Sequence, residues 1–232
     1  YELCDYQATA FRENAGIPIG LRDFDNFNLR DLTANQEAWH IAVYADGDTA
    51  GALTSDGGVD GWGNSTETYS LRFFAPHSST EVGTSQRHTG TWSDTKSRVV
   101  VTSQYGKAIG IYGTSGVSHV TVEGLQFRVD TASTTAGAGS GGIFYQAGTV
   151  GRLTVRNNIF RNFRSTSGNE GGIFVHQTSA AVLTSYIYNN LFYADGANVW
   201  GAAIEIHKGI GYIYNNTIHA TDFGIYSDLT NG

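Results

Sequence analysis

Two histidines and a glutamate occupy matching positions in two similar segments of the chain. Glu205 and His207 alternate in AAIEIH (202–207), and His176 ends the related segment GGIFVH (171–176). Residues two apart in a strand share one face, so Glu205 and His207 point to the same side. A carboxylate beside imidazoles can perform general acid–base chemistry, here on a polysaccharide. The same face could equally contact a glycan without reaction, or be a polar surface that meets solvent.

Aromatic residues extend this face and form a second one. If Ile173 and Ile204 point inward, the residues after them point outward, and His176 and His207 lie two positions beyond. Exposed tyrosines suit sugar faces or protein interfaces, because the ring buries area while the hydroxyl keeps a hydrogen bond. Stacked tyrosines also stabilise a sheet without any ligand. The predicted glycan contacts are Tyr188, Tyr214, Phe174, His176, His207 and Tyr226.

These residues belong to a repeat. The segments VTVEGLQF (120–127), LTVRNNIF (153–160), YIYNNLF (186–192) and YIYNNTI (212–218) recur at spacings of 33, 32 and 26 residues, measured at Val122 and its equivalents. Each is preceded by a second short apolar segment, while the segments between them vary in length. Repetition of this size predicts a solenoid of stacked strands, and no unit carries the 3.6-residue apolar stripe of a helix.

Asparagine pairs mark one corner of each repeat. A chain that bends from one strand into the next usually needs a residue with positive φ, which asparagine tolerates. The pairs Asn157–Asn158, Asn189–Asn190 and Asn215–Asn216 hold this position, and Gly124 holds it in the first unit. Because stacked strands lie about 4.8 Å apart, the second asparagines are expected to bond to one another as a ladder. Its members are Asn158, Asn190 and Asn216.

The units resemble the repeats of right-handed parallel β-helix proteins, such as pectate-lyase-like enzymes and phage tailspikes. The resemblance covers residues 98–228 and implies an all-β fold, a right-handed parallel β-helix (solenoid). A single domain is expected over 1–232, with an N-terminal cap and irregular coils in 1–97 and regular coils in 98–232. Segment 5–16 is predicted to form a short capping helix over the open end of the stack.

The motifs of the enzymes in this superfamily are mostly missing. A pectate-lyase-like site implies several outward acids for Ca²⁺ beside an arginine or lysine base. Arg156 and Arg161 are present, but no acidic cluster aligns with them. A polygalacturonase-like site implies grouped aspartates, which are scattered in this chain. The resemblance therefore predicts the fold and leaves the activity open.

No cofactor or structural metal is expected, and calcium is the one ion for which the sequence has a weak motif. The segment DGDTAG (46–51) begins like an EF-hand loop, yet Ala50 occupies a ligand position and Gly57 stands where glutamate is required. The acidic loop through Asp56 and Asp60 could hold a weaker ion.

Composition limits the partners. A net charge of −7 with only 14 Lys and Arg residues argues against a nucleic-acid partner, which needs clustered basic residues. No apolar run approaches the ~20 residues that span a bilayer, so no membrane insertion is expected. The lysine-poor polar surface is typical of secreted, extracellular or virion-surface proteins. The chain lacks Met, which predicts a processed product or a fragment, and the single Cys4 excludes an intrachain disulfide.

The sequence therefore favours an extracellular or virion-surface β-helix that serves structure or attachment and contacts glycans. Segment 223–232 stops partway through a coil, so a homo-oligomer or filament, or further chain, is expected to cover that edge. The alternative is a polysaccharide lyase or glycoside hydrolase that uses Glu205, His207 and His176.

Overall fold

A computed structural model gives the fold of the chain. It describes residues 31–45, 52–53, 58–60, 62–78, 80–81, 85–101, 106–112, 118–129, 141–147, 150–162, 171–177, 182–194, 201–219 and 223–228. The expected capping helix at 5–16, Cys4 and the loop 46–51 lie outside these residues. The described part contains no helix with the length and apolar character needed to cross a membrane.

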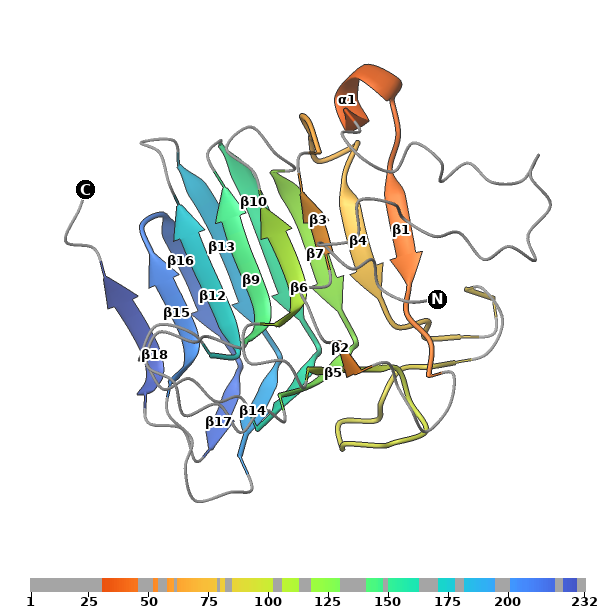
Figure 1. The fold of residues 1–232 in the computed structure, drawn as a ribbon, viewed down its shortest axis with the longest axis vertical. Coiled ribbons are helices and arrows are strands. Elements are labelled where there is room, and N and C mark those ends of the chain that lie inside the picture. Colours follow the sequence, from red (N-terminus) through yellow and green to blue (C-terminus); the bar gives the residue numbers. More distant parts are fainter. Residues whose placement is uncertain are drawn as a thin grey trace.

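The strands form three six-stranded parallel sheets, and the chain visits the sheets in the same rotating order (Figure 1). Sheet 1 contains β1 (Trp39–Ala42), β4 (Leu71–Phe74), β7 (His119–Glu123), β10 (Gly151–Arg156), β13 (Leu183–Tyr188) and β16 (Ile210–Tyr214). Sheet 2 contains β2 (Ala52–Leu53), β5 (Arg98–Val101), β8 (Gln126–Val129), β11 (Ile159–Arg161), β14 (Leu191–Tyr193) and β17 (Thr217–His219). Sheet 3 contains β3 (Gly58–Asp60), β6 (Lys107–Tyr112), β9 (Gly141–Ala147), β12 (Ile173–Gln177), β15 (Ala202–His207) and β18 (Phe223–Asp228). This is the arrangement of a parallel β-solenoid, with one strand of each sheet in every coil.

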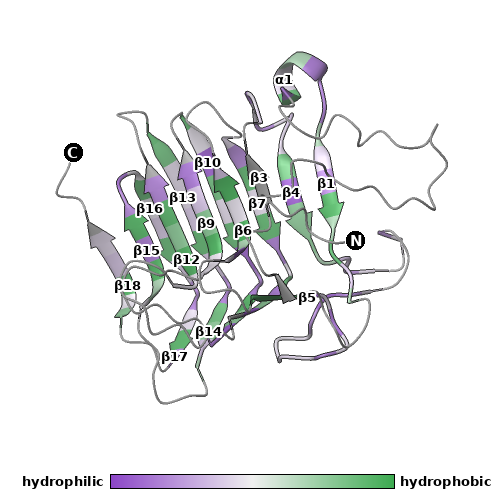
Figure 2. Ribbon diagram, in the orientation of Figure 1, coloured by the Kyte–Doolittle hydropathy of each residue, from purple (hydrophilic) through white to green (hydrophobic). Residues whose placement is uncertain are grey.

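Alternation along the strands separates the core from the surface. In β10 and β13, buried and half-buried residues alternate strictly, and hydrophobic and hydrophilic positions alternate along the strands of Figure 2. The inward residues pile into columns because neighbouring strands are in register. Phe160 of Sheet 2 lies between Phe127 and Phe192, with ring centroids 4.9 and 4.6 Å away. Each coil therefore buries its apolar residues only by stacking on its neighbours.

The asparagine corner lies between Sheets 1 and 2 and confirms the predicted ladder. Asn157, Asn189 and Asn215 have φ of 57°, 56° and 53°, and Gly124 has φ of 74°. The second asparagine of each pair points inward: the Oδ1 atom of Asn190 accepts hydrogen bonds from the backbone nitrogen and Nδ2 of Asn158, both at 3.0 Å. The corner thus binds adjacent coils together through side-chain amides.

A short helix, α1 (Leu32–Asn35), precedes the first coil. Asp31 caps it, because its Oδ1 accepts a hydrogen bond from the backbone nitrogen of Ala34 at 2.8 Å. Leu32 is fully buried and belongs to the hydrophobic core. This helix therefore packs on the core at the N-terminal end of the described solenoid.

At the other end of the described stack, β16, β17 and β18 are the last strands of their sheets. Ile225 of β18 is in register with the buried Ile204, yet it is 53% exposed. The same end exposes Ile210, Tyr212, Tyr214, Phe223 and Tyr226. Apolar positions that are buried in earlier coils are therefore open to solvent in this one.

Candidate functional site

The outer face of Sheet 3 brings together the residues expected to do chemistry. The register pairs Phe174 of β12 with Glu205 of β15, and His176 with His207. The next strand, β18, continues the first of these columns with Tyr226. The predicted columns therefore exist.

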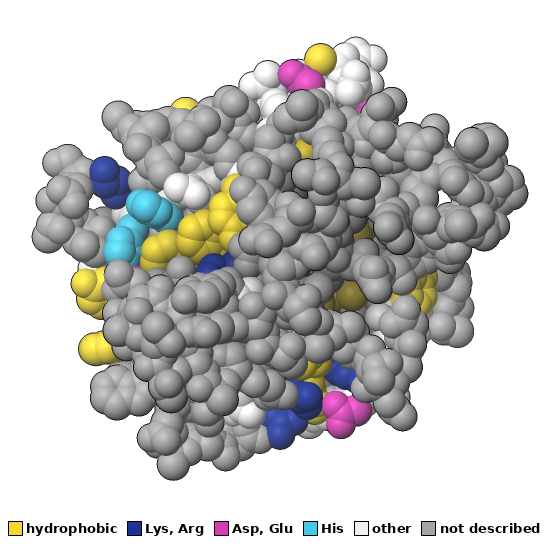
Figure 3. All heavy atoms as spheres, viewed as in Figure 1, with side chains coloured by type: hydrophobic (Ala, Val, Ile, Leu, Met, Phe, Trp, Pro, Cys, Tyr) yellow, Lys and Arg dark blue, Asp and Glu magenta, His cyan; other side chains and the backbone are white. Residues whose placement is uncertain are grey.

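An aromatic row leads across this face to the two histidines. The Phe144 ring lies 5.1 Å from Tyr112 and is stacked on Phe174 at 5.2 Å and 9°. Phe174 in turn lies 5.1 Å from the imidazole of His207. We call Tyr112, Phe144, Phe174, His176, His207 and Tyr226 the Sheet 3 row. Figure 3 shows this side of the molecule, with a hydrophobic band that ends at a pair of histidines.

Glu205 and His207 form a carboxylate–imidazole pair at the end of this row. The Glu205 side chain is completely buried, and its Oε1 atom contacts Nε2 of His207, whose side chain is 22% exposed. The contact fixes the orientation of the ring and leaves Nδ1 for a ligand or a transferred proton. A buried acid that orients a half-exposed imidazole can support either binding or acid–base catalysis.

His176 lies beside this pair. Its ring centroid lies 5.9 Å from that of His207, and the rings are nearly perpendicular. Burial is the main cause that lowers the pKa of His176. Electrostatic interaction with His207 and Lys208 lowers it further. Because its pKa is lowered from 6.5, the His176 imidazole is neutral at pH 7 and can accept a hydrogen bond or a proton.

The structure places two of the three tyrosines predicted to contact glycans, Tyr188 and Tyr214, on a different wall of the solenoid. Tyr188 and Tyr214 belong to β13 and β16 of Sheet 1, where their rings are stacked at 4.9 Å and 4°. Tyr186 and Tyr212 form a second stack on the same face, at 5.0 Å. The six predicted contacts therefore fall into two sets, four on Sheet 3 and two on Sheet 1, and do not form one site.

Sheet 1 carries a charged cluster that the sequence analysis did not predict. Glu123 of β7 is buried and accepts hydrogen bonds from Nε of Arg72 at 2.7 Å and from Nε of Arg156 at 2.6 Å. Nη2 of Arg87 lies 3.9 Å from the same carboxylate. Burial raises the pKa of Glu123, but the hydrogen bonds and charges of Arg72 and Arg156 outweigh it and hold the pKa below its usual value.

The sequence contains no acidic cluster aligned with Arg156 and Arg161, and the structure places one acid, Glu123, beside Arg156. Glu123 is the direct partner of Arg156 in the preceding coil. The aligned segments VTVE and LTVR contain that signal, because equivalent positions of stacked coils are neighbours. The cluster links three successive strands of Sheet 1, β4, β7 and β10, and its role in the fold is to hold them together.

Among the residues that the structure describes, no three or more His, Cys, Asp or Glu side chains are grouped closely enough to hold a metal ion. The calcium loop suggested by the sequence lies outside those residues, apart from the backbone of Asp60 in β3. Compared with protein-family models, with curated proteins and with solved structures, the chain matches none.

Proposed function

We propose that the protein is an extracellular or virion-surface β-helix of the right-handed, pectate-lyase-like and tailspike-like kind, which attaches to a polysaccharide through the Sheet 3 row. Support for the type of fold comes from the rotating order of the strands and from the asparagine corner. Support for the surface location comes from the polar, lysine-poor composition.

One observation carries the attachment function: the Sheet 3 row follows two neighbouring register columns from β9 through β12 and β15 to β18. Phe144, Phe174, Glu205 and Tyr226 are register partners in one column, and His176 and His207 are partners in the other. Tyr112 of β6 extends the row through its ring contact with Phe144. Neighbouring strands of the sheet lie about 4.8 Å apart along the solenoid axis. A linear polymer laid along that axis would meet the half-buried rings of Tyr112 and Phe144 and then hydrogen-bonding imidazoles, whereas Phe174 is buried and supports its neighbours. Such a mixture of apolar area and polar tips suits sugar rings, which present both.

The test is a glycan array probed with the purified protein. We expect binding to a subset of polysaccharides and at least a tenfold loss of affinity in His207→Ala. His219→Ala is the matched control, because His219 is an exposed histidine on Sheet 2, away from the row. Absence of binding to every glycan on the array, with particles seen only as dispersed monomers by electron microscopy, would overturn the proposal.

A second candidate, a polysaccharide lyase or glycoside hydrolase, is favoured by the contact between Glu205 and His207. In this function His207 exchanges a proton with the sugar, Glu205 stabilises the imidazolium, and His176 is the second acid–base group. The measurement is the appearance of reducing ends, or of the absorbance of unsaturated products, from a panel of acidic and neutral polysaccharides. Glu205→Gln should then remove turnover while binding persists. If no polysaccharide of the panel yields a product, the enzymatic function is rejected.

A further inference from the structure

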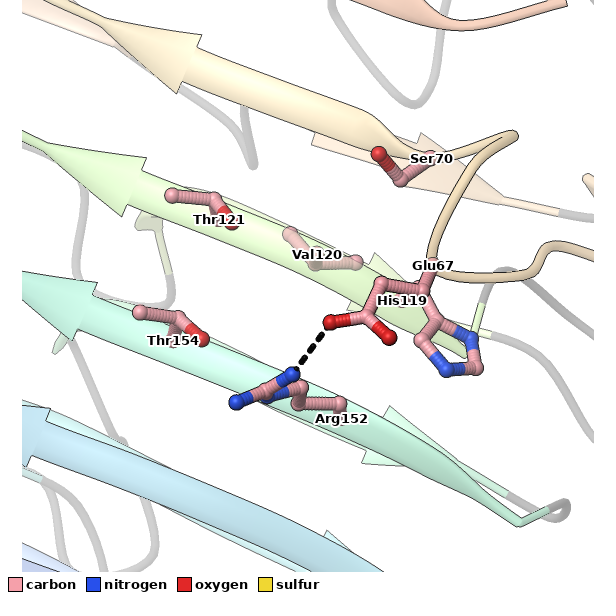
Figure 4. A pocket seen from close by; sticks show the side chains of 7 residues that line it. All are labelled: Glu67, Ser70, His119, Val120, Thr121, Arg152 and Thr154. Carbon is pink, nitrogen blue, oxygen red and sulfur yellow. Dashed lines mark hydrogen bonds and ion pairs between the residues drawn. The ribbon is translucent and has the colours of Figure 1, made fainter.

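A small polar pocket lies on the outer face of Sheet 1, above the beginnings of β7 and β10 (Figure 4). Its volume is about 100 Å³. The side chains that line it are Glu67, Ser70, His119, Val120, Thr121, Arg152 and Thr154. None of them belongs to the Sheet 3 row, so the pocket is separate from the proposed attachment face.

Glu67 and Arg152 form the charged part of the pocket. Nη1 of Arg152 donates to Oε1 of Glu67 at 2.7 Å, and the two side chains are 43% and 81% exposed. An ion pair this exposed contributes little to stability, so either partner can exchange it for a ligand. The guanidinium also lies over the ring of Tyr186, 4.5 Å from its centroid, which fixes its position. Nε of Arg152 is buried and has no hydrogen-bond partner among the residues that the structure describes.

Hydroxyl groups and one imidazole complete the lining. Thr121 and Thr154 are direct partners on neighbouring strands, and their hydroxyls follow one another on the outer face in Figure 4. His119 lies beside Glu67 in the same view, and burial lowers its pKa, so the ring is neutral at pH 7. The charges of Glu67 and Arg152 cancel. The pocket as a whole is therefore uncharged and contains both donors and acceptors.

We infer that this pocket binds one neutral sugar residue. Every hydroxyl of a sugar both donates and accepts hydrogen bonds, and a carboxylate and a guanidinium held side by side can engage two adjacent hydroxyls at once. Thr121 and Thr154 supply further partners along the next edge of the ring. An acidic sugar would gain from Arg152 but would be repelled by Glu67. The lining therefore selects a neutral residue over an acidic one.

Two threonines provide the test. Thr154→Val removes a hydroxyl from the pocket and keeps a β-branched side chain, whereas Thr184→Val makes the same change on β13, outside the lining. The probes are the methyl glycosides of glucose, galactose, mannose and N-acetylglucosamine, titrated by NMR into the full chain. We expect Thr154→Val to weaken binding about fivefold, the cost of one lost hydrogen bond, and Thr184→Val to leave it unchanged. Glu67→Gln should weaken it at least as much.

The imidazole signals separate this inference from the proposed function. Binding in the pocket should shift the signal of His119, assigned with His119→Gln, while the signals of His176 and His207 stay in place. Shifts confined to His176 and His207 would show that the sugar does not bind in the pocket, and they would support the attachment face instead. Stronger binding of methyl glucuronide than of methyl glucoside, or equal weakening by both threonine variants, would also overturn the inference.

Discussion

Nδ2 of Asn190 donates a hydrogen bond to Oδ1 of Asn216 in the next coil, at 3.0 Å. The same amide nitrogen donates to the backbone oxygens of Val155 and Tyr188, each at 3.0 Å. Because the Asn190 side chain is buried, water cannot replace these bonds. One amide therefore satisfies groups in three successive coils.

Asn190→Ala should lower the free energy of unfolding by about 3 kcal/mol, because it leaves several buried backbone groups without partners. Urea denaturation followed by circular dichroism measures the change. Asn189→Gly is the control: Asn189 is exposed with φ of 56°, a conformation open to glycine, so the change should stay within about 0.5 kcal/mol. A loss below about 1 kcal/mol in Asn190→Ala would show that the ladder is not a major source of stability.

Glu123→Gln should destabilise the protein by about 2 kcal/mol at pH 7, because it leaves Arg72 and Arg156 without their carboxylate. The arginines are 26% and 39% exposed, so this figure is smaller than for a fully buried pair. The pKa of Glu123 is lowered from 4.5 in the fold, so the wild-type contribution is complete above about pH 4.5 and is lost as pH falls below it.

Unfolding free energies measured from pH 7 to pH 3 check this prediction. The profile of Glu123→Gln should be flatter on the acid side than that of the wild type. Glu67→Gln removes an exposed carboxylate and should preserve the wild-type slope. Identical acid slopes in Glu123→Gln and the wild type would contradict the assignment.

Protonation of histidines should destabilise the fold at mildly acidic pH. Burial is the main cause that lowers the pKa of His88, whose Nε2 donates to the backbone oxygen of Asn157 at 2.9 Å. A lowered pKa means that the unfolded chain takes up the proton first, so stability is lost as pH falls below about 6.5. The melting temperature should therefore decrease between pH 7 and pH 5.5. His88→Gln should reduce that decrease, whereas the exposed His219→Gln should not.

Phe160→Ala should lower the free energy of unfolding by about 3–5 kcal/mol. The ring is stacked on Phe127 and Phe192, and its removal leaves a cavity in the middle of a column that both neighbours line. Phe160→Leu retains most of the volume and should cost about 1.5 kcal/mol. Thermal or urea unfolding measures both. Equal losses for the two variants would mean that ring stacking, and not the filled volume, stabilises the column.

We propose that the chain associates end to end and that the exposed apolar residues of β16 and β18 supply the contact. Ile225→Lys places a charge on this edge and should shift sedimentation profiles toward the monomer at high concentration. Val182→Lys is the matched control, since Val182 is 49% exposed and precedes β13 inside the stack. Association that is insensitive to Ile225→Lys, or equally sensitive to Val182→Lys, would argue against assembly through this edge.

The repeat was predictable because stacking demands like residues at like positions. The inward isoleucines and the asparagine corner can be read directly from the aligned segments, since these positions repeat the same or similar residues in successive coils. The period does not predict which wall of the solenoid a segment occupies. The sequence indicated a second face for the tyrosines without locating it, and the structure assigns Tyr188 to Sheet 1 and His207 to Sheet 3.

The partners that cross between coils and loops were not predictable. Arg72 meets Glu123 across 51 residues, and Glu67 meets Arg152 across 85. Glu67 and Arg87 lie outside the strands, in connections whose length varies from coil to coil, so no alignment of repeats locates them. The burial of Glu205 was also not predictable. Its position in the repeat shows that its side chain points outward, but it does not show which residues cover that side chain.

Successive positions of one outer column on Sheet 1 are chemically unequal. In strand order, the column contains His40, Arg72, Thr121, Thr154, Tyr186 and Tyr212. A polymer of identical units placed on it would meet an imidazole and a guanidinium first, then two hydroxyls and then two aromatic rings. Moving that polymer by one unit, or reversing its reducing and non-reducing ends, would change every contact. A scaffold built by repetition thus acquires a directional axis that can discriminate the two orientations of its ligand.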